Sequence, residues 1–373
     1  MITPRHRTAW RAWRSGDVDE AARLARPHRG AERLLVLADL VRGRFEQGLA
    51  RYQALRRPPR ALDMPVAHAW VHLDRVDKAC EHLCRRRRRL PPGLALRRDH
   101  PMTVKVHGPV TLPFADHPLA PYLPALEGTL NGRHALIHLD TGGAFLVMGL
   151  ERAAAMGVEA VPAGRRFHGV TRTPVRTGLV RELDLGGVAL TNVPVDVLPT
   201  LTGPQDIVIM GTCLLRHFLP TIDVPAGHLL LAPRGHHPPP DGVRVPFCLW
   251  ADHFMFAKGG HGPRDLTFFV DSGLVHLIED DGRIRQAAVL ATRSQYRTWG
   301  IPRADLAATH LTAPHPLRLG PLEQTAHLLS VAPGRTAPWS DFGGVRIDGL
   351  ISQAFLSEYA WTLDFDRQEY TFQ

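Results

Sequence analysis

The sequence has few cysteines and no long hydrophobic run. Its four cysteines, Cys80, Cys84, Cys213 and Cys248, are too few in 373 residues for a disulfide framework. We expect four free thiols, as is typical of a reducing compartment. No apolar run approaches the roughly 20 residues that a membrane helix needs. The basic N-terminus is not followed by the apolar core of a secretory signal. These absences predict a soluble, cytoplasmic protein that is not bound to a membrane.

The formal net charge of +9 raises the question of nucleic-acid binding. The basic residues are overwhelmingly arginine, and the one dense run is Arg85–Arg89. No basic patch with interleaved aromatic residues accompanies that run. We therefore expect a solvated, arginine-rich helix end there, and we do not expect nucleic acid as a partner.

Residues 1–92 carry apolar and small residues at helical spacing throughout. Three short motifs, GDVDEA (16–21), GRFEQG (43–48) and DRVDKA (74–79), each follow one apolar helical stretch and open another. This pattern predicts an α-helical domain of paired helices that resembles a degenerate tetratricopeptide (TPR-like) array. A plain helical bundle is the alternative. No catalytic residue types cluster here, so we expect the domain to recruit or orient a protein partner, and its deletion to leave the cleavage of a short peptide intact.

Beyond this domain the sequence changes to short strand-like runs separated by Gly, Pro and Asn, the pattern of an all-β domain. Two proline-rich stretches mark boundaries. We expect a linker at 93–102, a first β unit at 103–235, a short proline-rich linker at 236–242 and a second β unit at 243–373. The histidines of the second linker are expected to be solvated, with no metal bound.

Two acidic triplets stand in apolar surroundings. HALIHLDTGGAFLVM (134–148) contains Asp140-Thr141-Gly142, and LTFFVDSGLVHL (266–277) contains Asp271-Ser272-Gly273. A carboxylate flanked in this way is expected to be at least partly buried, where retaining its charge is costly. One such triplet is a weak signal, because acidic turns often follow strands. A second triplet in the other β unit makes a shared site the better interpretation.

The surroundings of the two triplets repeat as well. A hairpin precedes each triplet, and the first hairpin has the tight-turn pair Asn131-Gly132. A strand, a short leucine-containing helix and two further strands follow each triplet, at 206–232 and 347–372. Aligning Thr221-Ile222-Asp223 with Thr362-Leu363-Asp364 superimposes these two blocks. Residues 103–235 and 243–373 are therefore expected to be two copies of one lobe.

These two halves resemble aspartic peptidases, and bacterial retropepsin-like domains are similar in loop spacing. The resemblance covers about 270 residues and leaves the helical N-terminus outside it. It implies an all-β, double-lobed, acid-protease-like barrel in which Asp140 and Asp271 are the catalytic pair. It also implies that Thr141, Gly142, Ser272, Gly273 and Gly211 support the active site. The activity implied is aspartic endopeptidase activity on a polypeptide substrate.

The chemistry of paired carboxylates is consistent with that resemblance. Two carboxylates a few Å apart do not both ionise easily, so they share a proton and titrate as a pair. The charged partner then acts as a general base on a water molecule, and the protonated partner polarises the scissile carbonyl. This mechanism needs no cofactor and no metal.

Three features of the sequence bear on the activity. Residues 165–199 predict a hairpin whose tip, near His168 and Gly169, is a candidate flap. Leu274 follows the second triplet, where the family has a smaller residue, and Ser352 aligns with Gly211. Two alternatives stay open: a catalytically inactive protease-like module that binds peptides or proteins, and a single competent lobe that acts as a homodimer.

Overall fold

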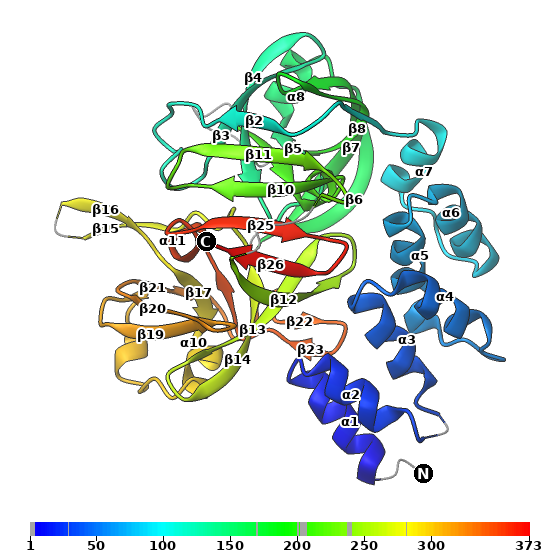
Figure 1. Cartoon of the computed structure of the whole chain (residues 1–373), viewed down its shortest axis with the longest axis vertical. Coiled ribbons are helices and arrows are strands. Elements are labelled where there is room, and N and C mark those ends of the chain that lie inside the picture. The colour runs from blue at the N-terminus through cyan, green and yellow to red at the C-terminus, as the bar shows by residue number, and fades with distance from the viewer. Residues whose placement is uncertain are drawn as a thin grey trace.

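The structure, a computed structural model of the chain, describes residues 4–28, 30–168, 171–199, 201, 207–236, 241–280 and 282–373. Its N-terminal part is helical and runs along one side of a larger β-rich part (Figure 1). The helices of this part are α1 (Pro4–Arg14), α2 (Val18–Ala25), α3 (Glu32–Val41), α4 (Phe45–Gln53), α5 (Asp63–His72), α6 (Val76–Arg85) and α7 (Pro92–Asp99). Helix α7 lies where the sequence predicts a linker. Pro91 and Pro92 explain its position, because proline is well accommodated just before and at the first helical residue.

The three sequence motifs of this segment mark the turns between consecutive helices. Gly16, Gly43 and Asp74 follow α1, α3 and α5, and all three have left-handed backbone conformations with φ of 78°, 66° and 56°. The N–H of the next residue in each motif donates to the carbonyl five residues earlier, the bond that defines a Schellman helix end. Each turn leads directly into the next helix, so α1–α2, α3–α4 and α5–α6 form helical hairpins.

The sequence predicts that the run Arg85–Arg89 is a solvated helix end, but two of its arginines bind a buried carboxylate. Arg86 and Arg88 both donate to the carboxylate of Asp63, at 2.7 and 2.8 Å. Asp63 is fully buried at the start of α5, so its charge requires these partners. Arg87 ends α6 with a left-handed conformation. Part of the run therefore holds α6 against α5.

The first β unit contains a closed barrel. Six strands follow the order β8-β5-β9-β4-β3-β7, and β7 pairs back onto β8. The elements of this unit are β1 (Thr103–Val106), β2 (Val110–Pro113), β3 (Ala125–Leu130), β4 (Arg133–Asp140), β5 (Leu146–Gly149), α8 (Leu150–Ala155), β6 (Ala160–His168), β7 (Thr171–Asp184), β8 (Val188–Leu198), β9 (Val208–Gly211), α9 (Thr212–Leu215), β10 (Phe218–Asp223) and β11 (His228–Pro233).

The second β unit repeats part of this strand order. Its order β21-β17-β24-β14-β13 matches β8-β5-β9-β4-β3 pair by pair, with the same alternation of parallel and antiparallel neighbours. Its elements are β12 (Val243–Trp250), β13 (Phe254–His261), β14 (Arg264–Val270), β15 (Leu277–Asp280), β16 (Arg283–Gln286), β17 (Val289–Thr292), α10 (Arg293–Thr298), β18 (His310–Leu311), β19 (His315–Leu319), β20 (Leu322–Ala326), β21 (Leu329–Ala332), β22 (Asp341–Phe342), β23 (Val345–Arg346), β24 (Gly349–Ile351), α11 (Gln353–Leu356), β25 (Ala360–Asp364) and β26 (Glu369–Phe372).

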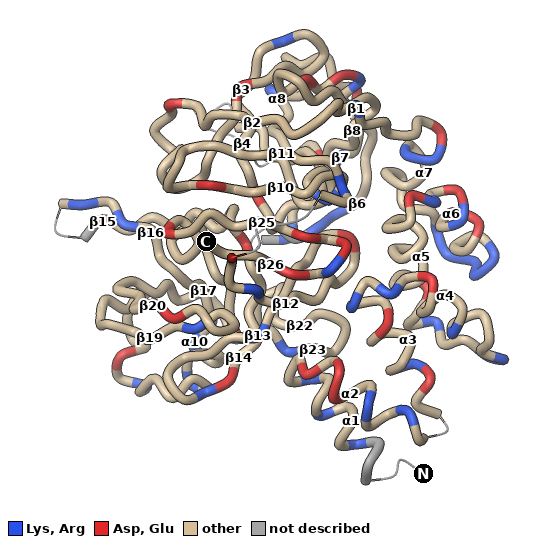
Figure 2. The backbone as a smooth tube through the Cα atoms, viewed as in Figure 1, with Lys and Arg blue, Asp and Glu red and all other residues tan. Residues whose placement is uncertain are grey.

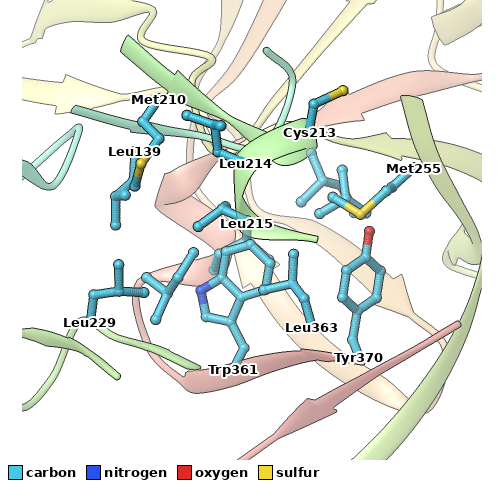
Figure 3. Packing of buried hydrophobic residues seen from close by; sticks show 14 of the residues in the cluster. Leu139, Met210, Cys213, Leu214, Leu215, Leu229, Met255, Trp361, Leu363 and Tyr370 are labelled. Atoms are coloured by element: carbon cyan, nitrogen blue, oxygen red, sulfur yellow. The ribbon is translucent and has the colours of Figure 1, made fainter. Parts of the chain in front are cut away.

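One sheet joins the two β units. Strand β10 pairs with β25, so that Thr221 lies opposite Thr362, and the order β12-β26-β25-β10-β11-β2 crosses from one unit to the other. The two aligned threonines contact each other through their hydroxyl groups at 2.6 Å. Buried side chains from both units pack together between this sheet and α9, including Leu139, Leu215 and Trp361 (Figure 3). The two β units therefore share one hydrophobic core.

A second hydrophobic core joins the helices to the second β unit. It contains Trp13 and Leu37 from the helices together with Phe256, Phe269 and Phe342 from the strands. All five side chains are buried. The helical segment is thus packed onto the strands over a continuous apolar surface. Within the described residues, no helix combines the length and the apolar character that crossing a bilayer requires.

Candidate active site

Asp140 is the last residue of β4. That strand pairs in parallel with β9, which places Gly211 directly beside Asp140. The backbone N–H groups of Gly142 and Gly143 both donate to Oδ1 of Asp140, at 2.7 and 3.1 Å. Two N–H donors stabilise a carboxylate in its charged form. The local turn therefore fixes the orientation of the Asp140 carboxylate.

Asp271 follows β14 in the equivalent position of the second unit. Strand β14 pairs in parallel with β24, with Val270 opposite Ile351, so that Ser352 occupies the place that Gly211 has in the first unit. The N–H of Gly273 donates to Oδ1 of Asp271 at 3.1 Å. Asp271 is therefore held by the same kind of turn as Asp140.

Each aspartate lies against a glycine of the opposite triplet: Asp271 against Gly142, and Asp140 against Gly273. A Cβ atom on Gly142 would lie 2.3 Å from Oδ1 of Asp271, and one on Gly273 would lie 2.1 Å from Oδ1 of Asp140. Only glycine permits approaches this close. Both carboxylates are half-buried. Burial, the negative charge of Asp140 and a hydrogen bond with the Asp140 side chain together raise the pKa of Asp271 well above its usual range. These effects favour the protonated form of the Asp271 carboxyl group.

Thr141 and Ser272 join the two triplets. The N–H of Thr141 donates to the hydroxyl of Ser272, and the N–H of Ser272 donates to the hydroxyl of Thr141, each at 3.0 Å. Both residues are buried. The Thr141 hydroxyl also donates to the carbonyl of Val270 at 3.3 Å. These bonds fix the orientation of one aspartate turn relative to the other.

Ser352 is accommodated without a clash. Its hydroxyl donates to the carbonyl of Ala287 at 2.6 Å and accepts from the N–H of Ala354 at 3.1 Å. It thus caps α11, as serine commonly does at a helix start. The position differs from Gly211, where a Cβ atom would lie 2.3 Å from the backbone of Gly143.

Leu274, the other departure in the second triplet, contributes its backbone to the site. Its N–H acts with that of Gly273 to lower the pKa of Asp271, which opposes part of the effect of burial. The carbonyl of Leu274 accepts from the side chain of Gln286 at 2.8 Å. The side chain of Leu274 is partly buried against the core that the helices share with the second unit. Its bulk is therefore accommodated in that core.

The predicted flap is only partly described. The predicted range 165–199 covers parts of two hairpins, β6–β7 and β7–β8, rather than one. His168 is the last residue of β6. The side chain of His168 and the whole of Gly169 lie outside the described residues. The flap at this tip therefore remains a prediction.

The sequence did not reveal two features close to the dyad. Thr212, the residue after Gly211, donates its hydroxyl to the carbonyl of Thr141 at 2.8 Å. The second feature is the β15–β16 hairpin, which projects from the second unit (Figure 1). Five residues, 141–145, separate Asp140 from β5, whereas seventeen, 272–288, separate Asp271 from β17. That difference in spacing was the available signal for an inserted hairpin.

One group of potential metal ligands lies within the described residues. The ligand atoms of Cys213, Asp252 and His253 are within 4.8 Å of one another. Burial raises the pKa of the Cys213 thiol, and the thiol donates to the carbonyl of Asp252 at 3.2 Å. His253 and Asp252 hydrogen-bond to each other at 2.6 Å. The thiol therefore bonds to a backbone carbonyl and the His253 ring bonds to the Asp252 carboxylate, and a neutral thiol is a poor metal ligand.

Comparison with known proteins points to one family. Residues 126–214 match the aspartyl protease family. The matched range includes Asp140, Thr141, Gly142 and Gly211, and it ends before the second triplet. No curated protein matches the chain. Among solved structures, a retropepsin-like aspartic protease from Rickettsia conorii is similar at 17% identity and a TM-score of 0.27, covering 35% of this chain and 95% of that one.

Proposed function

We propose that the chain is an aspartic-type endopeptidase whose two β units are the two lobes of one active site. The observation that carries the proposal is the mutual placement of Asp140 and Asp271, each beside the other's glycine. Supporting it are the raised pKa of Asp271, the Thr141–Ser272 hydrogen bonds and the match of residues 126–214 to the aspartyl protease family.

The proposed mechanism assigns a different role to each carboxylate. Asp140, which accepts two backbone N–H bonds, is the charged partner and removes a proton from a water molecule. Asp271 is the protonated partner and donates to the oxygen of the scissile carbonyl. Water oxygen bonds to the carbonyl carbon and gives a diol. As the C–N bond breaks, the proton held by Asp140 passes to the leaving nitrogen. A hydroxyl of the diol gives its proton to Asp271 and becomes the carbonyl of the new carboxyl group, which restores both aspartates to their starting states. No metal or cofactor takes part.

The direct test substitutes each aspartate separately. We expect Asp140→Asn and Asp271→Asn each to abolish the hydrolysis of a peptide library at both acidic and neutral pH, because the reaction needs one charged and one protonated carboxyl group. The matched control is Asp223→Asn, which changes a turn aspartate outside the site whose Oδ1 accepts from the N–H of Ala226. Hydrolysis that survives either active-site substitution contradicts the proposal.

The two alternatives predict different results in the same assay. An inactive binding module leaves every peptide uncut by the wild type, while a bound peptide still raises the melting temperature. A single competent lobe acting as a homodimer loses activity with Asp140→Asn only, and its specific activity rises with protein concentration. The presence of both carboxylates in one chain favours the single-chain mechanism over the homodimer. The TPR-like character of the helices, a protein partner for them and a cytoplasmic location are further proposals.

A further inference from the structure

The helical segment contacts the first β unit through one buried arginine. Arg216 follows α9, and only 4% of it is exposed. Its guanidinium donates to the carbonyls of Val71 and His72 at 3.2 and 3.1 Å, and to Asp74 at 2.8 Å. The two carbonyls belong to the last turn of α5, where the negative end of the helix dipole favours a cation. Arg216 therefore caps α5 from another part of the chain.

Helix α9 continues this contact to the first aspartate turn. The N–H of Arg216 donates to the carbonyl of Thr212 at 2.9 Å. Thr212 bonds through its N–H to the carbonyl of Gly143, and through its hydroxyl to the carbonyl of Thr141. The short helix α9 therefore connects the end of α5, which Arg216 contacts, to the turn that holds Asp140, which Thr212 contacts.

The helical segment also contacts the strand that carries the second aspartate. The hydroxyl of Thr267, on β14, donates to the carbonyl of Ser15 at 3.0 Å. Lys258 of the neighbouring strand β13 donates to the same carbonyl at 2.8 Å and lies 3.3 Å from Asp17. Thr267 is four residues before Asp271. The turn between α1 and α2 is therefore anchored on β14.

The contact through Arg216 belongs to the first unit alone. The residue equivalent to Arg216 in the second unit is Ser357, which follows α11. Ser357 bonds to Ala354 within its own turn. A general requirement of the lobe would place an arginine in both units. The asymmetry indicates that Arg216 serves the docking of the helices.

We propose that the helical segment is a brace that fixes the two aspartate turns relative to each other, and that Arg216 is the positioning residue through which it holds the Asp140 turn. The expected effect on catalysis rests on the proposed function. The expected effect on structure, that Arg216 keeps residues 139–146 rigid, does not. A brace of this kind contrasts with a helical segment that merely recruits a partner and leaves the site unaffected.

The test uses the full-length protein with Arg216→Met, which keeps an unbranched stem of similar length but removes the guanidinium group and all of its donors. We expect kcat to fall about tenfold with little change in KM, because displacement of the Asp140 turn affects the chemistry more than ground-state binding. We also expect the pH profile to shift, since the titration of the pair depends on its spacing. Arg216→Lys should restore part of kcat. Ser357→Ala, at the equivalent position of the second unit, is the matched control expected to leave kcat close to wild type.

A second measurement does not depend on activity. Hydrogen exchange followed by mass spectrometry should show faster exchange in residues 139–146 of the Arg216→Met protein, with the β19–β20 hairpin unchanged. Wild-type exchange in residues 139–146 overturns the brace, even where the melting temperature falls. If the wild type cuts no peptide and Arg216→Met still loosens residues 139–146, the proposed function fails and the brace stands.

Discussion

Thr141 and Ser272 each donate a backbone N–H to the other's hydroxyl at 3.0 Å, across the boundary between the two β units. The exchange is nearly symmetric, although one residue is threonine and the other serine. Because both side chains are buried, water cannot replace either bond. The geometry of the two aspartates therefore depends on these two hydroxyl groups.

Replacement of Thr141 by valine tests this dependence. The substitution preserves the shape of the side chain but leaves the N–H of Ser272 and the carbonyl of Val270 without their partner. A buried polar group without a partner costs about 1–3 kcal/mol, so we expect the free energy of unfolding to fall by about that amount. Peptide hydrolysis should fall as well. Urea unfolding measures the first effect, and Thr141→Ser, which keeps the hydroxyl, should stay near wild type in both assays.

The equivalent positions Gly211 and Ser352 should respond very differently to alanine. In Gly211→Ala the new Cβ meets backbone atoms of Gly143 at 2.3 Å, so the Asp140 turn must move. We expect a loss of about 1–3 kcal/mol in the free energy of unfolding, as for overpacked cores, together with most of the hydrolytic activity. Ser352→Ala removes a helix cap and should cost about 1 kcal/mol. Equal effects of the two substitutions on activity would contradict this difference.

The raised pKa of Asp271 makes stability depend on pH. Between the unfolded pKa of about 3.9 and the raised folded pKa, the folded protein retains a proton that the unfolded chain has released. The contribution of Asp271 to stability therefore declines as pH rises through this window. Asn cannot titrate, so the melting temperature of Asp271→Asn should rise relative to wild type as the pH rises from about 4 towards the folded pKa of Asp271. A difference that stays constant with pH in thermal scans argues against a raised pKa, and Asp223→Asn provides the control.

The local parts of this fold could be predicted from the sequence. The two triplets, the hairpin turn at Asn131 and the motifs at Gly16 and Gly43 are short patterns whose residue types determine the backbone conformation. The pairing of Asp140 with Asp271 followed from their repeated surroundings. The backbone predictions depended on residues that are neighbours in the chain, and the pairing came from comparing two such local patterns that lie 131 residues apart.

The contacts that join distant segments could not be predicted in the same way. In the sequence, Arg86 and Arg88 cannot be told from solvated charges, because their partner Asp63 is 23 and 25 residues away. Lys and Arg positions form a dense run at the end of α6 and are scattered over other parts of the chain (Figure 2), and nothing in the sequence distinguishes those that bind across the fold. Arg216 is a single arginine after a short helix, and its partners are 142 or more residues away. Its role depends on where α5 lies.

The sequence analysis expects that deleting residues 1–92 leaves the cleavage of a short peptide intact, and the packing of the helices bears directly on this prediction. Trp13 is fully buried, and its indole N–H donates to the carbonyl of Gly343 at 2.9 Å. Removal of residues 1–92 would expose the apolar face formed by Phe256, Phe269 and Phe342. Exposed apolar patches of this kind favour aggregation. We therefore expect the truncated chain to be poorly soluble and to bind a hydrophobic dye.

A point substitution separates this structural effect from the loss of a whole segment. Trp13→Ala should lower the free energy of unfolding by about 3–5 kcal/mol, the range for a large aromatic side chain removed from a core. Leu150→Ala, at an apolar residue that is 48% exposed, should change it by less than about 0.5 kcal/mol. Urea unfolding compares the two variants. A wild-type-like midpoint for Trp13→Ala, or a soluble truncated chain with normal peptide cleavage, would show that the helices are dispensable. The shared core predicts the opposite, because Phe269 on β14, the strand that leads to Asp271, is buried in the core that the helices help to form.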